Sequence, residues 1–150
     1  MTLTLRQATM NDAELLLQWR NDDKVRRASN SMDVITKEQH LNWLSESLAR
    51  SDRRLLVAEL PDHRAVGTVR LDWDGRNWQV SWTVAPDARG AGIAKRMVRQ
   101  SVSILNEPAT AEVKAWNLAS IKVAEAAGLR EYRRDACKVY FSTPESGFAD

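Results

Sequence analysis

A glycine-rich turn between a strand-like and a helix-like segment constrains the fold of this chain most. Residues 78–84 alternate apolar and polar side chains with the period of a half-buried strand. Pro86 lacks a backbone donor, so the strand is expected to end before it. Apolar residues then return at helical spacing up to about residue 105, which predicts a helix that begins near Gly90 or Gly92. The chain therefore passes from strand to helix through a turn with two glycines.

This turn has the features of an anion-binding site. The first turn of a helix leaves backbone N–H groups unpaired and carries the positive end of the helix dipole, so a phosphate can bind there. Gly90 and Gly92 lack a Cβ and let a phosphate come close to the backbone. An ordinary loop whose glycines only serve the turn geometry is the alternative. A dinucleotide-binding fingerprint fits less well, because it requires G-x-G-x-x-G at the start of a parallel βαβ unit.

Length and composition indicate an ordinary globular protein. The 150 residues suit a single domain over residues 1–150, and 43% hydrophobic with 28% charged residues is a common balance. No apolar run approaches the ~18 residues of a membrane span, and the first residues lack the layout of a signal peptide. We therefore expect a cytoplasmic protein that does not bind membranes.

Charge and cysteine content exclude several kinds of site. The net charge of +2 is too small to argue for nucleic-acid binding. Arginine outnumbers lysine, and arginine suits recognition of phosphate and carboxylate, although most of these side chains are expected to lie in solvent. Cys137 is the only cysteine, which excludes an intrachain disulfide and a cysteine-rich metal site, and no metal is expected. Its neighbours read as a late strand, so we predict that Cys137 packs in the core.

Hydrophobic periodicity and capping signals divide the rest of the chain into strands and helices. Thr36 with Gln39 three residues later has the form of a capping box. Asn117 is predicted to cap a helix that ends at Gly128 as its C′ residue. Strands are expected over residues 2–8, 55–58, 65–73, 78–84, 109–116, 129–132 and 137–141. The main helices are expected over 12–21, 36–49, from 90 or 92 to about 105, and 118–127, with a short helical piece at 24–28.

Two motifs and the order of elements resemble the GCN5-related N-acetyltransferase (GNAT) superfamily over nearly the whole chain. Residues 89–94 resemble its Arg/Gln-x-x-Gly-x-Gly/Ala signature, and they follow the Val-x-Pro strand end typical of the family. Residues 113–129 are similar to its later segment, in which a strand is followed by Asn, a helix carrying Ser or Ala, and Gly. The resemblance implies an α/β fold with a mixed, mostly antiparallel sheet of six to seven strands and about four helices.

The resemblance also implies acetyl-CoA as co-substrate and a set of residues that bind it. The pantetheine arm would lie between the fourth and fifth strands, which would splay apart after Val84. Asn117 would face this arm, although a plain helix cap is an alternative role that is compatible with it. The residues implied to bind acetyl-CoA are Thr83, Val84, Arg89, Gly90, Ala91, Gly92, Ile93, Ala94 and Asn117.

The N-terminal part resembles one branch of the superfamily in particular. Residues 17–22, 25–26 and 35–43 are similar to acetyltransferases that act on the amino group of nucleotide-linked 4-amino sugars, as in pseudaminic acid biosynthesis. This branch grades into ribosomal-protein N-terminal acetyltransferases. Arg20 and Asn21, at the end of a predicted helix, are candidate substrate contacts, and a capping or surface role is the alternative.

N-acetylation requires an unprotonated amine near the thioester carbonyl, donors for the developing oxyanion, and a proton for the leaving thiolate. His40 is the candidate base because the ordinary pKa of histidine is about 6.5 and the resembling branch has a histidine here; simple packing is the alternative.

Two positions depart from the wider family. Gln79 stands where many members have Glu, and Ala124 where many have Tyr, so those two proton-transfer groups are missing. Glu59, Asp72 and Glu112 are carboxylates that could relay a proton through water.

The sequence thus predicts an acetyl-CoA-dependent N-acetyltransferase that transfers directly to a primary amine of a small molecule. The leading acceptor is an amino sugar nucleotide. A protein N-terminus as acceptor is one alternative, and a catalytically weak acyl-CoA-binding module is another. Exposed strand edges are compatible with a homodimer.

Overall fold

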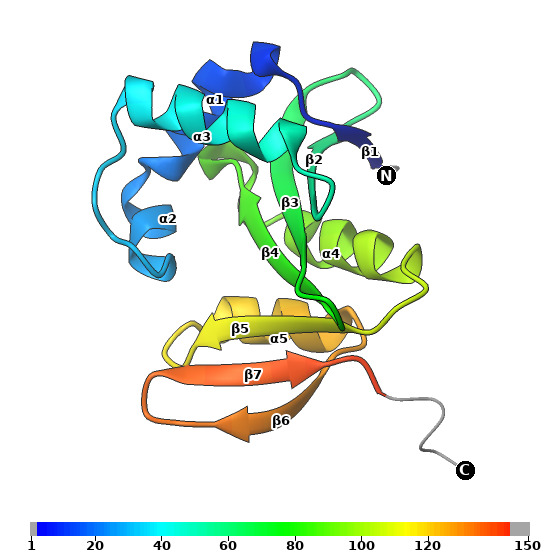
Figure 1. Cartoon of the computed structure of the whole chain (residues 1–150). Coiled ribbons are helices and arrows are strands. Elements are labelled where there is room, and N and C mark those ends of the chain that lie inside the picture. Colours follow the sequence, from blue (N-terminus) through cyan, green and yellow to red (C-terminus); the bar gives the residue numbers. More distant parts are fainter. Residues whose placement is uncertain (1–2, 145–150) are drawn as a thin grey trace.

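In the computed structural model, which describes residues 3–144, seven strands form one sheet in the order β1-β2-β3-β4-β5-β7-β6 (Figure 1). Neighbouring strands are antiparallel except β4 and β5, which run parallel. The predicted mixed, mostly antiparallel sheet is confirmed. The strands are β1 (Thr4–Gln7), β2 (Arg53–Glu59), β3 (Ala65–Trp73), β4 (Trp78–Val84), β5 (Ala109–Lys114), β6 (Arg130–Arg134) and β7 (Lys138–Ser142).

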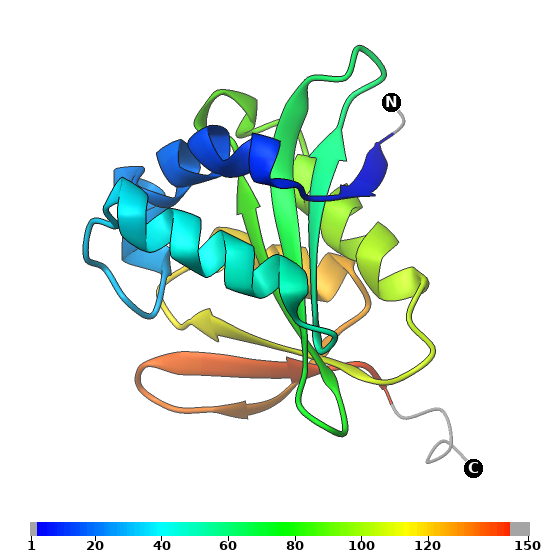
Figure 2. The same ribbon diagram turned by 45° about the horizontal axis from the view of Figure 1, so that its top comes forward.

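Helices cover both faces of the sheet. The helices α1, α2 and α3 lie on one face, and α4 and α5 lie on the other (Figures 1 and 2). Short 3-10 turns, η1 (Met10–Asp12) and η2 (Pro86–Ala88), precede α1 and follow β4. The α-helices are α1 (Ala13–Arg20), α2 (Asp23–Ala28), α3 (Lys37–Ala49), α4 (Ile93–Ser103) and α5 (Leu118–Ala126).

The predicted helix caps are present. Thr36 Oγ1 accepts from the Gln39 N–H at 3.2 Å, and Gln39 Oε1 accepts from the Thr36 N–H at 3.0 Å, which is the reciprocal pair of a capping box. Gly128 has a φ of 92°, which glycine adopts without strain, and it ends α5 as a Schellman motif. These local signals explain why the helix ends were predictable from sequence.

Alternation along the strands separates a buried face from an open one. On β5 and β7, Ala111, Val113, Val139 and Phe141 are buried on the α4 and α5 side. Their neighbours, such as Glu112, point to the opposite face and are half-buried or exposed. The sheet therefore offers a polar surface on β4, β5 and β7, beside α1 and α2.

Cys137 does not pack in the core, so that prediction is wrong. It is exposed in the turn between β6 and β7. Asp135 Oδ1 accepts hydrogen bonds from the N–H groups of Cys137 and Lys138, each at 2.8 Å. This local turn begins β7 one residue after Cys137 and leaves its side chain in solvent. Most other element boundaries agree within two residues; Thr2 in the predicted first strand lies outside the described residues.

A charged network ties the first strand to the helical layer. Arg6 on β1 pairs with Asp12 at 2.8 Å and with Glu59 on β2 at 2.9 Å. The hydrogen bonds from Arg6 hold the pKa of Asp12 below its ordinary value of 3.8. Because the native pKa is depressed, the stabilisation is present above the unfolded pKa and is lost as the pH falls through the native pKa.

We expect Asp12→Asn to lower the free energy of unfolding at pH 7 by about 1–2 kcal/mol, the usual effect of losing a hydrogen-bonded charge that is largely buried. The difference from wild type should shrink below about pH 4, where the carboxyl group becomes protonated. Urea unfolding across this pH range measures it, with the exposed Glu46→Gln as control. A difference that stays constant with pH would contradict the assignment.

Candidate functional site

The two parallel strands of the sheet separate almost where they begin. Only Trp78 with Ala109 and Gln79 with Thr110 are paired between β4 and β5. The sequence placed the divergence after Val84, and the structure places it after Gln79, five residues earlier on β4. The reason is that β4 stays paired with β3 while β5 stays paired with β7, so the twist of each pair carries the strands apart (Figure 1). Both strands thus turn unpaired backbone edges toward the gap.

The glycine-rich turn lies directly beyond the open end of β4. Gly90 and Gly92 have φ angles of 84° and 74°, a left-handed conformation that favours glycine. Gly92 is the N-cap of α4 and offers no side chain to the first N–H groups of the helix. A Cβ built on either glycine would meet no atom within 4 Å. The N-terminus of α4 is therefore uncapped and accessible, as an anion site requires.

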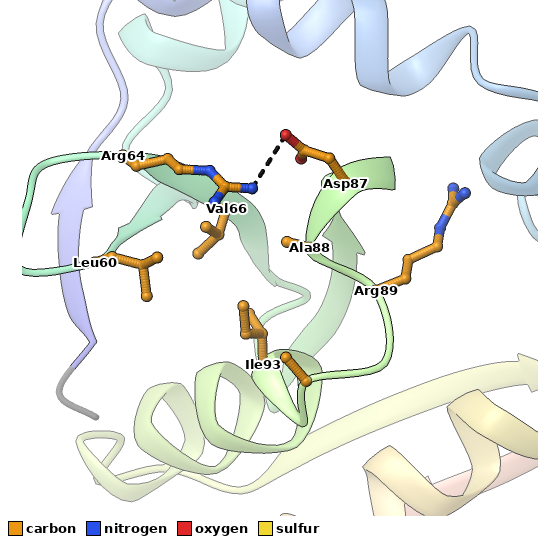
Figure 3. Close-up of a pocket in the computed structure, with 8 residues that line it drawn as sticks. Leu60, Arg64, Val66, Asp87, Ala88, Arg89 and Ile93 are labelled. Carbon is orange, nitrogen blue, oxygen red and sulfur yellow. Dashed lines mark ion pairs between the residues drawn. The ribbon is translucent and has the colours of Figure 1, made fainter.

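A pocket of about 170 Å³ adjoins this turn (Figure 3). The ion pair between Arg64 and Asp87, at 3.0 Å, lies at one side of it. Three residues predicted to bind acetyl-CoA line the pocket, namely Arg89, Ala91 and Ile93. The remaining lining comes from Leu60, Arg64, Val66, Asp87 and Ala88.

Helix α2 contacts both sides of the gap between β4 and β5. Arg89, after β4, forms an ion pair with Asp22, whose side chain caps α2. Lys114, at the end of β5, donates from Nζ to the Arg27 carbonyl at 2.6 Å. Figure 1 shows α2 beside the diverging ends of the two strands. The sequence motif identified Arg89, but it gave no indication that Asp22 would be its partner.

The other predicted acetyl-CoA contacts lie around the same opening. Thr83 and Val84 are half-buried at the end of β4, beyond its pairing with β5, and Ala94 is in the first turn of α4. Asn117 follows β5, and its Oδ1 accepts from the Ser120 N–H at 3.2 Å, which confirms the predicted helix cap. Contact of these residues with acetyl-CoA stays a prediction.

His40 lies on α3 and is buried on the side of that helix that faces α1. Its side chain stacks on Trp43 with ring centroids 5.9 Å apart, and the residue is only 4% exposed. Burial holds the pKa of His40 below its ordinary value, although a hydrogen bond to the Ala13 carbonyl acts in the opposite direction. Burial and stacking fit the packing role that the sequence left open, but among the described residues no group accepts from or donates to the buried Nε2 of His40. The role of His40 as catalytic base stays a prediction.

Asn21 and Arg20 hold the loop between α2 and α3. The Asn21 amide donates to the Ile35 carbonyl and accepts from the Ile35 N–H, both at 2.8 Å. Arg20 donates to the Ser31 carbonyl at 2.8 Å. Both side chains thus have structural contacts, and their predicted contact with substrate stays a prediction.

Gln79 on β4, which stands where many family members have glutamate, contacts the carboxylate of Glu112 on β5. Gln79 Nε2 donates to Glu112 Oε2 at 2.7 Å, and the other oxygen of Glu112 pairs with Lys138 at 3.1 Å. The other two candidate carboxylates, Glu59 and Asp72, are paired with arginines. Glu112 is thus the candidate that lies where β4 and β5 begin to separate. Ala124 is fully buried in α5 and leaves the place of the family tyrosine without a proton donor.

Within residues 3–144, no cluster of His, Cys, Asp and Glu side chains is arranged to hold a metal ion. No described helix has both the length and the apolar character needed to cross a membrane.

Residues 2–130 match the family model described as an acetyltransferase (GNAT) domain. The chain belongs to the GNAT acetyltransferase family. Many solved structures share its fold, including two with coenzyme A bound. The spermidine N-acetyltransferase from Vibrio cholerae, in complex with CoA and spermine, has a TM-score of 0.85 at 17% identity over 99% of this chain and 98% of that one. AAC(6')-Ib, in complex with ribostamycin and coenzyme A, has a TM-score of 0.82 at 19% identity over 99% and 97%.

The family assignment confirms the predicted N-acetyltransferase and its acetyl-CoA co-substrate. No curated protein matches this GNAT chain in sequence. One of these structures is named as a spermidine N-acetyltransferase and the other is bound to ribostamycin, and neither name mentions an amino sugar nucleotide, the acceptor of the branch that the N-terminal residues resemble.

We expect Gly92→Glu to weaken acetyl-CoA binding by at least about 100-fold, because it places bulk and negative charge at the accessible N-terminus of α4. Calorimetry with acetyl-CoA measures the change. Gly75→Glu is the matched control, since Gly75 has a similar φ of 94° but lies in the turn between β3 and β4. Unchanged affinity of Gly92→Glu for acetyl-CoA would contradict the assignment of an anion-binding site to this turn.

We expect His40→Asn to keep turnover within a few-fold of wild type while lowering the free energy of unfolding. The native pKa of His40 is depressed, so its contribution to stability is present above the ordinary pKa of 6.5 and is lost as the pH falls. Urea unfolding at pH 5 and pH 8, with turnover from pH 6 to 9, tests both points. A loss of turnover of about 100-fold or more with intact acetyl-CoA binding would instead identify His40 as the general base.

Proposed function

We propose that this chain, as a single domain over residues 1–150, transfers the acetyl group of acetyl-CoA directly to a primary amine of a small molecule. The observation that carries the proposal is the gap between β4 and β5, which opens after Gln79 and leads to the uncapped turn at Gly92. An extended arm with amide groups fits between two unpaired strand edges, and a phosphate fits at the helix N-terminus.

The proposed reaction takes place at the end of β4. The amine nitrogen attacks the thioester carbonyl carbon, and the backbone N–H groups near Thr83 and Val84 stabilise the oxyanion that forms. The C–S bond then breaks, giving the acetylated amine and the CoA thiolate. Direct transfer needs no covalent enzyme intermediate, because both substrates are held side by side.

Protons move through water in this proposal. Gln79 cannot take a proton from the amine, but Glu112, which accepts a hydrogen bond from Gln79, can accept one through a bridging water. The thiolate is protonated by solvent, since Ala124 offers no acid. His40 remains the alternative base, with its burial as the argument against it.

The proposed acceptor is an amino sugar nucleotide, supported by the resemblance of residues 17–43 to that branch. One of the two structural relatives is a spermidine N-acetyltransferase, and the other is bound to ribostamycin. Both support a small amine as the acceptor, but neither supports an amino sugar nucleotide in particular. A protein N-terminus is the second enzyme hypothesis, and a weak acyl-CoA-binding module is the third. The cytoplasmic location, the lack of nucleic-acid and membrane partners, and the homodimer stay predictions.

We expect the protein to acetylate 4-amino sugars linked to uridine diphosphate faster than spermidine or short peptides with a free N-terminus. Release of free CoA thiol, followed by mass spectrometry of each amine, measures the three rates side by side. Selective acetylation of peptides would favour the N-terminal acetyltransferase hypothesis. Tight acetyl-CoA binding without turnover on any amine would favour the binding module.

A further inference from the structure

Three arginines come from separate elements on the face of the sheet that α1, α2 and α3 cover (Figure 1), where Arg70 Cζ lies 6.0 Å from the ring centroid of Trp43 on α3. Arg20 lies at the end of α1, Arg26 in α2 and Arg70 in the middle of β3.

Arg20 donates to the Ser31 carbonyl at 2.8 Å and Arg26 donates to the Met32 carbonyl at 3.3 Å, so the two guanidinium groups contact neighbouring residues of one loop. Burial, and then the positive charges of Arg26 and Arg70, lower the pKa of Arg20. Like charges repel, so the protein alone gains nothing by bringing them together.

Two of these arginines carry buried donors that nothing accepts. Within the described part of the chain, Arg20 Nη1 and Arg26 Nε are buried and have no hydrogen-bond partner. A buried donor without a partner costs on the order of 1–3 kcal/mol, and more when it is charged. Such donors are rare in native structures, and an ordered water or a bound ion is one way to satisfy them.

The cluster also has more positive than negative charge. Arg26 pairs with the exposed Asp23 at 2.7 Å, and Arg70 pairs at 2.9 Å with Asp72, which Arg53 also contacts at 2.6 Å. Among residues 3–144, no carboxylate forms an ion pair with Arg20, which donates to the neutral carbonyl of Ser31. An anion would therefore both satisfy the free donors and balance the charge.

The cluster is within reach of the reacting groups. Arg70 is the register partner of Ser81 on β4, so the two side chains share one face of the sheet. Adjacent strands are about 4.8 Å apart, and β4 borders the gap. Helix α2, which carries Arg26, also contacts both sides of that gap. One small molecule can thus span the distance from the arginines to the proposed transfer site.

We propose that the acceptor amine also carries an oxyanion, a phosphate or a carboxylate, which binds to Arg20 and Arg26 with Arg70 alongside. This inference rests on the proposed small-molecule N-acetyltransferase and names the chemical class of its acceptor. Arginine suits either oxyanion because its planar group donates two parallel hydrogen bonds. The same cluster disfavours polycations such as spermine, which would meet three like charges.

The test compares acceptors that differ only in the anion. One pair is a 4-amino sugar with and without its uridine diphosphate, and a second is an amino acid and its amide. In wild type we expect kcat/KM to be about 10- to 100-fold higher for the anionic member, which corresponds to one or two charged hydrogen bonds. A preference in the first pair only identifies phosphate as the ligand, and a preference in the second only identifies carboxylate. Equal rates within both pairs would overturn the inference while leaving the N-acetyltransferase proposal intact.

Substitutions in the arginine cluster test whether it causes the preference for the anionic acceptor. Arg26→Gln should raise KM for the anionic acceptor about 10-fold or more, with kcat for the neutral acceptor and acetyl-CoA affinity unchanged, and Arg26→Lys should restore part of the loss. The matched control is Arg27→Gln, an exposed neighbour in α2 that lies outside the cluster. An equal effect of Arg26→Gln on both acceptors would contradict the assignment.

A thermal unfolding measurement tests anion binding at the arginine cluster without requiring turnover. With CoA saturating the first anion site, inorganic pyrophosphate or acetate should raise the melting temperature of wild type but not of the Arg20→Gln, Arg26→Gln double variant. Retained CoA binding shows that the double variant is folded. No stabilisation of wild type by either anion would overturn the inference even if no acceptor is ever found.

Discussion

The site depends on one interruption of sheet pairing. Strands β4 and β5 share only two register positions, and beyond Gln79 each is committed to its other neighbour. The interruption has a cost, because backbone groups along both edges are left without strand partners. The buried layers on the α4 and α5 side hold the two halves of the sheet in place around the gap. An unpaired opening is therefore built into the fold.

Helix α2 connects this opening to the polar face of the sheet. It is short and has no buried residues, so hydrophobic packing alone does not position it. Polar contacts do: Asp22 pairs with Arg89 on one side, and the Arg27 carbonyl accepts from Lys114 on the other. The same helix carries Arg26 into the arginine cluster. The glycine-rich turn and the proposed acceptor site are thus joined through one small helix.

The candidate proton-transfer groups depend on contacts that a sequence motif does not record. Gln79 stands where the family often has a strand glutamate, and the carboxylate of Glu112 on β5 accepts a hydrogen bond from it. His40 looks like a base in sequence, but the structure buries it against Trp43 and Ala13. The sequence shows which residue types are present, whereas solvent access and hydrogen-bond partners in the folded protein decide which of them can exchange a proton.

The sequence by itself determined the strands, the helix caps and the glycine-rich turn, because periodicity, capping boxes and left-handed glycines act over a few neighbouring residues. It also determined the family, through motifs around Gly92 and Asn117. Only the tertiary structure decided where β4 and β5 part, that Cys137 is exposed, and that Arg20 and Arg26 contact neighbouring carbonyls of one loop. These features depend on the register and twist of strands far apart in the chain, and on which charges the fold brings together, which no local pattern records.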